Sequence, residues 1–494
     1  MVWWTWIGYI LVGFYALALF YVLVFCLSQL HLLWLYAKHQ QRPSQSPPPP
    51  PSRWPPVTVQ LPIYNEMYVV ERLIRNIMML DYPRDLLEVQ VLDDSNDETV
   101  AIAARIVQEY RLQGYHIRHI RRPERQGYKA GALQYGLEQA TGEYIAIFDA
   151  DFLPTPDFLR QTIPWFTNPH VGVVQTRWEH LNESYSLITA LQAFQLNVHF
   201  SVEQTGRQEG QYLLQFNGTG GIWRRQTIID AGGWQPDTLT EDLDLSYRAQ
   251  LKGWKIQYLE NLGSPAELPA EMNGLKSQQH RWMKGGAETA KKNLPRVWES
   301  ALPLSKKIHA TLHLMASAIF VFVFMIGVFS VPVLFLTRFL GINIQYFAWF
   351  LTGMLAVVAV YFAGNVTTGW SQGSWGRKVL KFLVLFPVFL SLSMGLSLHN
   401  SVAVFQGWLG RKSSFVRTPK FNIRSLTDSF RNHRYLAHPI SGLTVWEGVL
   451  TLYFLAAVGL GIYFGITSFI IFHVMLAFGY GMIFYYSLRH LEVR

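Results

Sequence analysis

Long stretches without charged residues alternate with segments that contain both charged and apolar residues along this chain of 494 residues. Five stretches contain no Asp, Glu, Lys or Arg: 7–26, 308–337, 339–376, 382–410 and 448–488. A helix that spans a bilayer needs roughly 20 mostly apolar residues, more than a soluble core helix usually has. The pattern predicts an integral membrane protein. Because no small-residue cleavage pattern follows the first stretch, residues 1–37 are expected to be a retained transmembrane anchor.

Between the first two apolar stretches, short β-branched runs alternate with amphipathic helical runs. The runs VTVQLPIY, EVQVLDD and YIAIFDAD end in polar residues, and MYVVERLIRNIMML and TVAIAARIVQEYRL have helical spacing. Such alternation predicts βαβ units and a mostly parallel sheet. We expect an α/β domain over 57–303, after a Pro-rich linker over 38–56.

Ligands of a parallel sheet bind beyond the carboxyl ends of its strands. The polar pairs Asn65–Glu66, Asp93–Asp94 and Asp149–Asp151 all fall at predicted strand ends. Neither a GxGxxG nor a GxxxxGK phosphate loop occurs in the sequence. A nucleotide on this sheet would therefore be bound by a structure other than these two phosphate loops.

After Pro303 the apolar pattern resumes. We expect two spans in 304–364, an interfacial or re-entrant helix with a loop in 365–443, and two spans in 444–494. Lys and Arg flank the stretch 379–410 on both sides, and a single crossing cannot place both flanks in the cytoplasm. Five spans then place the α/β domain and the C-terminus in the cytoplasm.

The charge distribution favours a membrane over nucleic acid. The net charge is +9, but only 15% of residues are charged, and basic residues cluster beside the apolar stretches. That distribution fits the positive-inside rule and anionic lipid head groups, whereas a nucleic-acid module needs a basic face of its own. We therefore expect no nucleic-acid partner.

The motif DAD places two carboxylates two residues apart at a strand end. Asp149 and Asp151 could share a divalent cation, or they could lie in a solvated turn. Lys129, just after Gly127, could hold phosphate at a helix N-terminus, or be an ordinary exposed lysine. Asp242 in TED could act as a general base, or cap the helix that follows.

Two other polar groups allow two interpretations each. Asp93 and Asp94 could contact a base or ribose, or Asp94 or Ser95 could be the N-cap of the next helix. In QQHRW, Arg281 suits a diphosphate and Trp282 a sugar face, but both also suit interfacial anchoring. Gln278 fits simple anchoring poorly.

The motifs LPIYNE, VLDDS, GYKAGAL, DAD, FNGTGG, TED and QQHRW occur in this order. Together they resemble the membrane-embedded family 2 glycosyltransferases, and most closely the cellulose-synthase-like A and C branch and its bacterial relatives. The resemblance implies an α/β GT-A fold, Rossmann-like, embedded between transmembrane helices. It also implies an inverting transfer of hexose from UDP-glucose or GDP-mannose. The product would be a β-1,4-linked polysaccharide that leaves through the enzyme's own channel.

The resemblance also implies roles for particular residues. It makes Asp242 the catalytic base and assigns a Mg²⁺ or Mn²⁺ cofactor to Asp149 and Asp151. The donor-binding residues would be Asn65, Glu66, Asp93, Asp94, Lys129, Asp149 and Arg281. The acceptor-binding residues would be Trp282, Gln278, Asn217, Gly218 and Glu241. A gating loop would contain Arg417, Thr418 and Lys420, which otherwise read as a basic patch for lipid head groups.

The sequence is compatible with three functions. The first is a processive polysaccharide synthase, the second a transferase that adds one or a few sugars to a membrane lipid, and the third a non-enzymatic scaffold. The expected partners are a nucleotide-sugar donor, a growing polysaccharide or lipid acceptor, membrane lipids and accessory secretion partners. The expected location is a plasma membrane, or the inner membrane of a bacterium.

Overall fold

The computed structural model describes residues 2–42, 47–342, 352–369, 373–413, 416–423, 428 and 441–490. Parts of three predicted segments lie outside the described residues. They are 43–46 of the linker, 343–351 around the start of one predicted span, and Phe415 with most of 424–440 in the predicted loop region.

A sheet of seven strands forms the centre of the α/β domain in the described part of the chain. Its strands are β1 (Val57–Ile63), β2 (Leu87–Asp93), β3 (Ile117–Ile120), β4 (Tyr144–Ile147), β5 (Val171–His180), β6 (Gly221–Arg224) and β7 (Lys255–Ala266). Their order is β3-β2-β1-β4-β6-β5-β7. Only β6 runs antiparallel to its neighbours, so the prediction of a mostly parallel sheet is confirmed.

The central strands form where the sequence is continuously apolar or β-branched. In β1 every residue except Pro62 is fully buried, as expected for a parallel strand with both faces covered. The helix after it, α2 (Val70–Ile77), buries Val70, Leu73, Ile74 and Ile77 at spacings of three and four. Register with β2 is continuous from Val57–Leu87 to Ile63–Asp93, so the polar residues after both strands lie at one edge.

Further helices cover the sheet or lead from it to the membrane part. They are α3 (Thr99–Leu112), α4 (Tyr128–Gln139), α5 (Phe158–Thr162), α6 (Leu187–Val198), α7 (Gln204–Glu209), α8 (Arg225–Asp230), α9 (Glu241–Leu251) and α10 (Met272–Glu299). A π-helical turn, His199–Glu203, joins α6 to α7. The structure agrees with the predicted helix over 99–112 at both ends.

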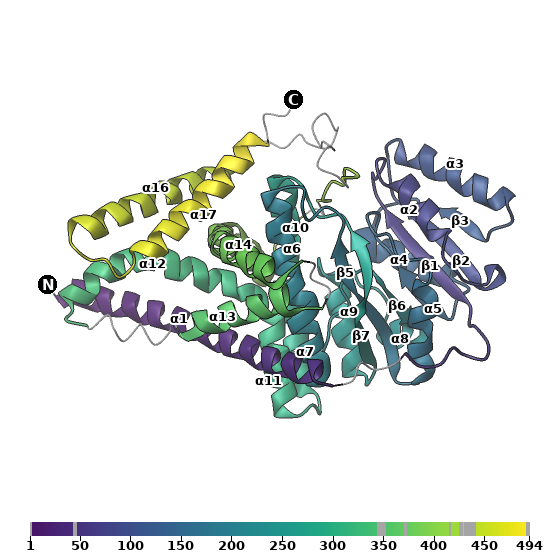
Figure 1. Cartoon of the computed structure of the whole chain (residues 1–494), viewed down its shortest axis with the longest axis horizontal. Helices are drawn as coiled ribbons and strands as arrows, with labels where there is room; N and C mark the ends of the chain where they lie inside the picture. Colours follow the sequence, from purple (N-terminus) through teal and green to yellow (C-terminus); the bar gives the residue numbers. More distant parts are fainter. Residues whose placement is uncertain are drawn as a thin grey trace.

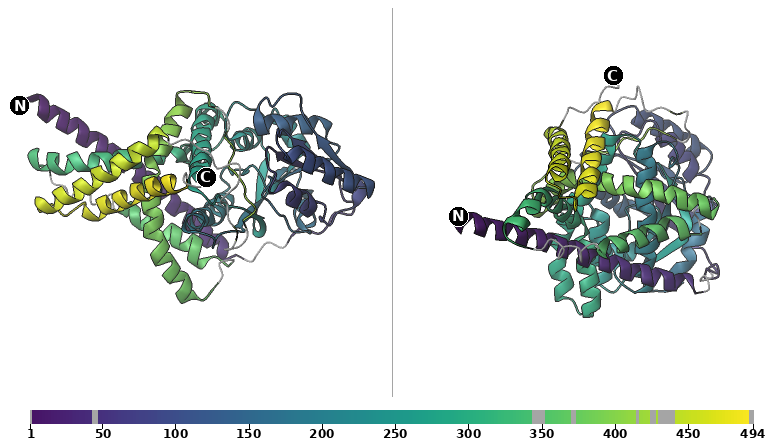
Figure 2. Two further views of the ribbon diagram at one scale, coloured as in Figure 1. Left: turned by 90° about the horizontal axis from the view of Figure 1, so that it is seen from above. Right: turned by 60° about the vertical axis from the view of Figure 1, so that its left-hand side comes forward.

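Apolar helices make up the rest of the molecule and lie beside the sheet domain (Figure 1). They are α1 (Val2–Gln40), α11 (Leu304–Leu314), α12 (Ile319–Phe339), α13 (Thr352–Phe362), α14 (Trp375–Gly395), α15 (Ser397–Trp408), α16 (Gly442–Tyr463) and α17 (Ile470–Arg489). Figure 2 shows α1 running from the far end of the helical part to the sheet domain. Among the described residues, five helices are long and apolar enough to cross a membrane: Thr5–Gln40, Ala316–Leu336, Trp375–Gly395, Gly442–Tyr463 and Ile470–Arg489.

The helix α14 differs from the other long apolar helices in direction. It is seen nearly end-on in Figure 1, whereas α1, α12, α16 and α17 run along the length of the molecule. Its Lys381 pairs with Glu183 of the α/β domain at 2.5 Å. Length alone allows α14 to span a membrane, and the expected interfacial position of 379–410 remains a prediction.

Candidate active site

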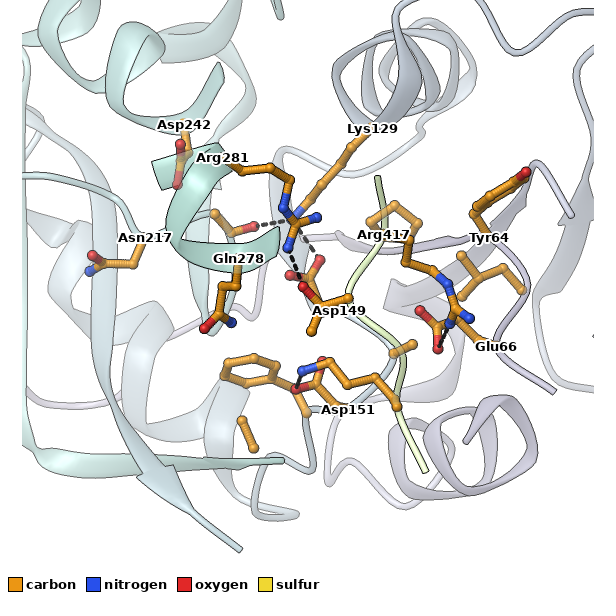
Figure 3. A pocket seen from close by; sticks show the side chains of 18 of the residues that line it. Tyr64, Glu66, Lys129, Asp149, Asp151, Asn217, Asp242, Gln278, Arg281 and Arg417 are labelled. Carbon is orange, nitrogen blue, oxygen red and sulfur yellow. Dashed lines mark hydrogen bonds and ion pairs between the residues drawn. The ribbon is translucent and has the colours of Figure 1, made fainter. Parts of the chain in front are cut away.

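One pocket of about 220 Å³ opens at the carboxyl ends of β1 and β4, between the sheet and α10 (Figure 3). It brings together residues as far apart in the sequence as Pro62 and Lys420. Predicted site residues that line it are Glu66, Asp94, Lys129, Asp149, Asp151, Asn217, Gly218, Glu241, Asp242, Gln278, Arg281, Trp282, Arg417, Thr418 and Lys420. Most residues singled out by motif therefore meet in one pocket.

The DAD carboxylates follow β4 directly, and each is paired with a lysine. Lys129 Nζ lies 2.5 Å from Asp149 Oδ1, and Lys420 Nζ lies 2.6 Å from Asp151 Oδ2. Lys129 also donates to the carbonyl of Gly218 at 3.0 Å. Burial would lower the pKa of Lys129, but Asp149, Glu241 and Asp242 together raise it above its usual value. Asp149 and Asp151 both attract cations, so together they are suited to bind a metal ion that carries a diphosphate.

Asp242 lies in the first turn of α9, where its Oδ1 accepts a hydrogen bond from the N–H of Leu243 at 2.8 Å. Burial raises the pKa of Asp242, and the adjacent Glu241 raises it further. Gly218 has a φ of 80°, and a Cβ there would approach Asp242 Oδ2 to 3.0 Å. Only glycine suits that backbone and that close approach. The FNGTGG segment therefore needs glycine at position 218, where its backbone passes close to Asp242.

The helix α10 supplies three pocket residues from one face. Gln278, Arg281 and Trp282 are separated by three and four positions, so they project from the same side of the helix. Arg281 Nη2 donates to Thr418 Oγ1 at 2.7 Å. In Figure 3 the guanidinium of Arg281 lies close to Lys129 and Asp149. The cations therefore gather on the DAD side of the pocket.

Residues 416–423, which we call the loop segment, lie across the pocket. Arg417 Nη1 pairs with Glu66 Oε2 at 2.7 Å, and the N–H of Phe421 donates to Glu267 Oε1 at 2.9 Å. Burial raises the pKa of Glu66 to about 7, although Arg417 opposes that shift. The side chains of Phe421 and Ile423 are buried against Ala270. The loop segment thus has an apolar anchor and a charged part inside the site.

Aromatic and basic residues that the sequence did not single out line the end of the pocket near β1. The guanidinium carbon of Arg125 lies 3.4 Å from the ring centroid of Tyr64 and 4.9 Å from that of Tyr128. Asp94 forms a bidentate pair with Arg122, at 2.5 and 3.0 Å. The basic run RRPERQGYK was a signal for this end, but only the fold shows that Arg125 stacks on Tyr64.

Asn65 and Asp93 differ from the other predicted donor residues, since neither belongs to the described pocket lining. The N–H of Asn65 donates to Ser95 Oγ at 2.8 Å. Asp93 is buried, accepts from the N–H of Ser95 at 2.8 Å and lies 2.7 Å from His119 Nε2. Both residues brace the strand ends behind the pocket. Neither Asp94 nor Ser95 caps α3, whose N-cap position is Glu98.

The end of β5 adds two side chains that the sequence did not single out. Trp178 and His180 are two positions apart on the strand and both line the pocket. Their alternate spacing puts both on one face. Burial lowers the pKa of His180 to about 4, so its ring is neutral near neutral pH. A period-two pattern in TRWEH was the available signal.

Comparisons with known proteins agree with this geometry. Residues 55–285 match the family described as "Glycosyltransferase like family 2". Glucomannan 4-beta-mannosyltransferase 2 of Arabidopsis thaliana is 44% identical over 246 residues, which cover 49% of this chain and 46% of that protein. Glucomannan 4-beta-mannosyltransferase 1 of Oryza sativa subsp. japonica is 41% identical over 273 residues, 54% of this chain and 52% of that protein. The chain thus spans about half the length of these curated relatives.

The structural comparison extends further along the chain. A mannosyltransferase from Pyrobaculum calidifontis, PcManGT, solved in complex with GDP-Man and Mn²⁺, is similar over 81% of this chain and 100% of its own. The TM-score is 0.58 and the sequence identity is 20%. This similarity, with the sheet order and the family match, confirms the expected GT-A fold with apolar helices on both sides of it in the sequence.

Proposed function

Because residues 55–285 form a glycosyltransferase family 2 domain, we propose that this chain is an inverting hexosyltransferase that elongates a β-linked polysaccharide. The observation that carries the proposal is the convergence of Lys129, the DAD pair, Asp242 and the α10 face in one pocket. The names of the two plant relatives favour a β-1,4-linked mannose product, and the PcManGT complex favours GDP-mannose as donor.

The donor would lie across the strand ends with its base toward β1. Tyr64 and Arg125 offer a stacked aromatic and guanidinium surface for the base, and Asp94 offers carboxylate oxygens. Lys129 and Arg281 would bind the diphosphate, since both cations face the DAD acids. The sugar would then point toward Asp242 and Trp282.

The DAD acids fit a divalent cation. Asp149 and Asp151 supply oxygen ligands, and each already attracts an ammonium group. Mg²⁺ typically takes one or two carboxylates and completes its shell with substrate phosphates, so the site does not need a third protein carboxylate. A bound Mg²⁺ or Mn²⁺ would neutralise charge on the departing diphosphate.

Asp242 would act as the general base. Its carboxylate takes the proton from an acceptor hydroxyl while the hydroxyl oxygen attacks the anomeric carbon. The bond from that carbon to the diphosphate breaks, and its electron pair leaves with the nucleoside diphosphate. Arg281 and Lys129 stabilise the charge that develops there. In-line displacement inverts the centre, so an α-linked donor gives a β-linked product.

The loop segment would act as a lid over the donor. Arg417, Thr418 and Lys420 lie inside the pocket, where their cations and hydroxyl could reach a diphosphate. A lid excludes water, which matters because donor hydrolysis competes with transfer.

The chain would be a multi-pass membrane protein with the α/β domain in the cytoplasm. Five described helices, α14 among them, are long and apolar enough to span, and basic residues cluster beside the apolar stretches. The proposed arrangement counts the shorter apolar helix α13 as a span in place of α14. The polymer would leave between these helices. Membrane lipids and accessory secretion partners remain expectations.

A product assay tests this function. Purified protein is incubated with radiolabelled GDP-mannose, GDP-glucose or UDP-glucose, with and without Mn²⁺ or Mg²⁺, and the product is sized and digested with linkage-specific glycosidases. We expect a metal-dependent product of many sugars that an endo-β-1,4-mannanase cleaves. A short, solvent-extractable lipid product would favour the single-addition alternative. The absence of transfer from every donor would overturn the enzymatic function.

A further inference from the structure

The π-helical turn His199–Glu203 lies next to the pocket and carries a half-buried charged group. Glu203 Oε2 lies 3.0 Å from His199 Nδ1 and 3.3 Å from Arg207 Nη1. Burial would raise the pKa of Glu203, but Arg207 and His199 outweigh burial and hold it below its usual range. Glu203 is therefore an anion that can only accept. π-helical turns are rare and are often found at functional sites.

The second ring nitrogen of His199 faces the pocket wall. His199 Nε2 lies 2.9 Å from Oδ1 of Asn217, which is 9% exposed and lines the pocket. Each ring nitrogen of His199 therefore lies at hydrogen-bond distance from an oxygen atom, of Glu203 on one side and of Asn217 on the other. Arg207, Glu203, His199 and Asn217 thus form one chain of contacts that ends at the site.

The amide nitrogen of Asn217 is left without a partner. Within the described residues, Nδ2 is buried and makes no hydrogen bond. An unmet buried donor is costly, and native structures usually satisfy such groups or reserve them for a ligand. Since His199 occupies the oxygen, the amide nitrogen is the group that Asn217 keeps for the pocket.

The position of Asn217 indicates what it would meet. The next residue, Gly218, lies beside Asp242: a Cβ atom added to Gly218 would be 3.0 Å from Asp242 Oδ2. In Figure 3 Asn217 lies on the Asp242 and Gln278 side of the pocket, opposite Tyr64 and Glu66. A sugar that presents its reacting hydroxyl to Asp242 would therefore place a neighbouring hydroxyl near Asn217.

We propose that Glu203 and His199 are positioning residues that hold the Asn217 amide with its N–H group toward the acceptor sugar, where it donates to a hydroxyl oxygen beside the reacting one. This inference rests on the proposed transferase function. It adds two residues that do not touch the substrate and that none of the site motifs contains.

The test measures acceptor dependence in the full-length enzyme, with β-linked oligosaccharides as acceptors at saturating donor. His199→Phe removes both hydrogen bonds and keeps a ring. We expect its acceptor KM to rise about tenfold, as for the loss of one ordinary hydrogen bond, with the donor KM unchanged. Donor hydrolysis should rise relative to transfer, because a loosely held acceptor admits water. His199→Gln, which keeps a donor toward Asn217, should recover part of the acceptor KM.

Three further variants make the test decisive. Glu203→Gln should raise the acceptor KM by a smaller factor, and it serves if the phenylalanine variant does not fold. In an Asn217→Ala background, His199→Phe should have no further effect, because the residues act as one unit. Ser201→Ala removes a hydrogen bond on the same turn without touching Asn217, and it should behave as wild type.

The outcomes separate cleanly. Equal loss of transfer and hydrolysis with an unchanged acceptor KM would show a merely structural role and overturn the inference, as would additive effects of His199→Phe and Asn217→Ala. Such results leave the transferase function standing. Wild-type enzyme that transfers no sugar would overturn the proposed function itself, and this inference with it.

Discussion

Asp242 has the surroundings of a general base, since it faces the pocket and its Oδ1 accepts a hydrogen bond from the N–H of Leu243 in its own turn. Asp242→Asn keeps the shape and removes the basic oxygen. We expect kcat to fall by about 10²–10⁴-fold, while nucleotide affinity stays near that of wild type. Turnover and nucleotide binding are measured on the same preparation. The exposed Asp237→Asn is the matched control, and retained turnover in Asp242→Asn would remove Asp242 from this role.

The pH dependence of transfer reports on Asp242 and its neighbour Glu241. Burial and Glu241 raise the pKa of Asp242, and transfer needs its ionised form. Transfer should therefore fall as pH drops through that raised pKa, at higher pH than for an exposed aspartate, whose pKa is about 4. Glu241→Gln removes a neighbouring negative charge and should move this acid limb down by about one pH unit.

The control for that shift is an exposed glutamate outside the pocket. Glu138→Gln changes the net charge by the same amount and should leave the acid limb in place. An acid limb that Glu241→Gln does not move would mean that another group controls the profile.

Residues close in sequence could be predicted, and residues that meet only through the fold could not. Asp149, Asp151 and Asp242 follow apolar or turn signals that mark them as pocket acids. The stacking of Arg125 on Tyr64 joins positions 61 apart, and the contact of His199 with Asn217 depends on a π-helical turn. No periodicity in the sequence marks such a turn.

At the scale of elements, the loop segment already occupies the proposed cation site. Lys420 Nζ lies 2.6 Å from Asp151 Oδ2, where a divalent cation would also bind. Lys420→Met should therefore tighten Mn²⁺ binding without donor by about tenfold, which corresponds to about 1.4 kcal/mol of relieved repulsion. The same variant should turn over more slowly, and Arg417→Ala with Lys420→Ala should lower turnover further, because the lid loses its cations.

Calorimetric Mn²⁺ titration and turnover at saturating donor measure these effects. The exposed Lys412→Met is the matched control. If Arg417 and Lys420 instead hold lipid head groups, turnover of the double variant will depend on anionic lipid content. Wild-type turnover of the double variant in detergent would contradict the lid.

A buried ion pair joins α10 to α16. Lys276 Nζ lies 2.8 Å from Glu447 Oε1 and within 3.3 Å of Thr444 Oγ1, and both charged side chains are buried. Lys276→Met leaves a buried carboxylate alone, which should cost about 3–5 kcal/mol of unfolding free energy. Replacing both residues, Lys276→Met with Glu447→Leu, should recover much of that loss.

Thermal unfolding in detergent, followed by tryptophan fluorescence, measures this difference. Lys381→Met breaks an exposed pair with Glu183 and should cost at most about 1 kcal/mol. A double replacement as unstable as Lys276→Met would mean that packing, rather than the unpaired charge, determines the loss.

The elements that sequence patterns predicted well are those with uniform burial. The strands β1 and β2 and the helix α3 have a continuous apolar or helical pattern. The antiparallel strand β6 has only four residues, GIWR, and pairs between β4 and β5 after a turn rich in glycine. Its place depends on neighbours about 50 and 80 residues away, which local pattern cannot supply.

For the whole molecule, the open question is the path of 375–408 relative to the membrane. Both ends of this region contact the α/β domain or α10. Lys381 pairs with Glu183, Trp408 accepts through its carbonyl from Lys291 at 3.0 Å, and Ser413 accepts from Lys284 at 2.5 Å. A helix pair whose two ends meet the same domain is expected to return to the side from which it started.

We therefore expect α14 and α15 to lie at the cytoplasmic interface rather than to cross the bilayer. The apolar side chains that α14 exposes, Leu380, Leu383 and Val384, would then face lipid while its crosswise direction keeps both flanks on one side. Cysteines placed at Ser374 and Lys412 in a Cys26→Ser background should react with an impermeant maleimide from the cytoplasmic side only. Labelling of Ser374 and Lys412 from opposite sides would show that α14 crosses.

Two reference positions fix the sides. Gln113→Cys in the α/β domain should label from the same side as both test positions, because it lies at the exposed end of α3. Thr467→Cys, in the exposed turn between α16 and α17, should label from the other side, because one span separates it from the loop segment. If Gln113→Cys labels from outside, the orientation of the whole protein in the membrane is reversed. That result does not decide whether α14 crosses, because the side of the α/β domain and the path of α14 are measured independently. Agreement of Ser374 and Lys412 with Gln113, and their disagreement with Thr467, is the pattern that an interfacial α14 requires.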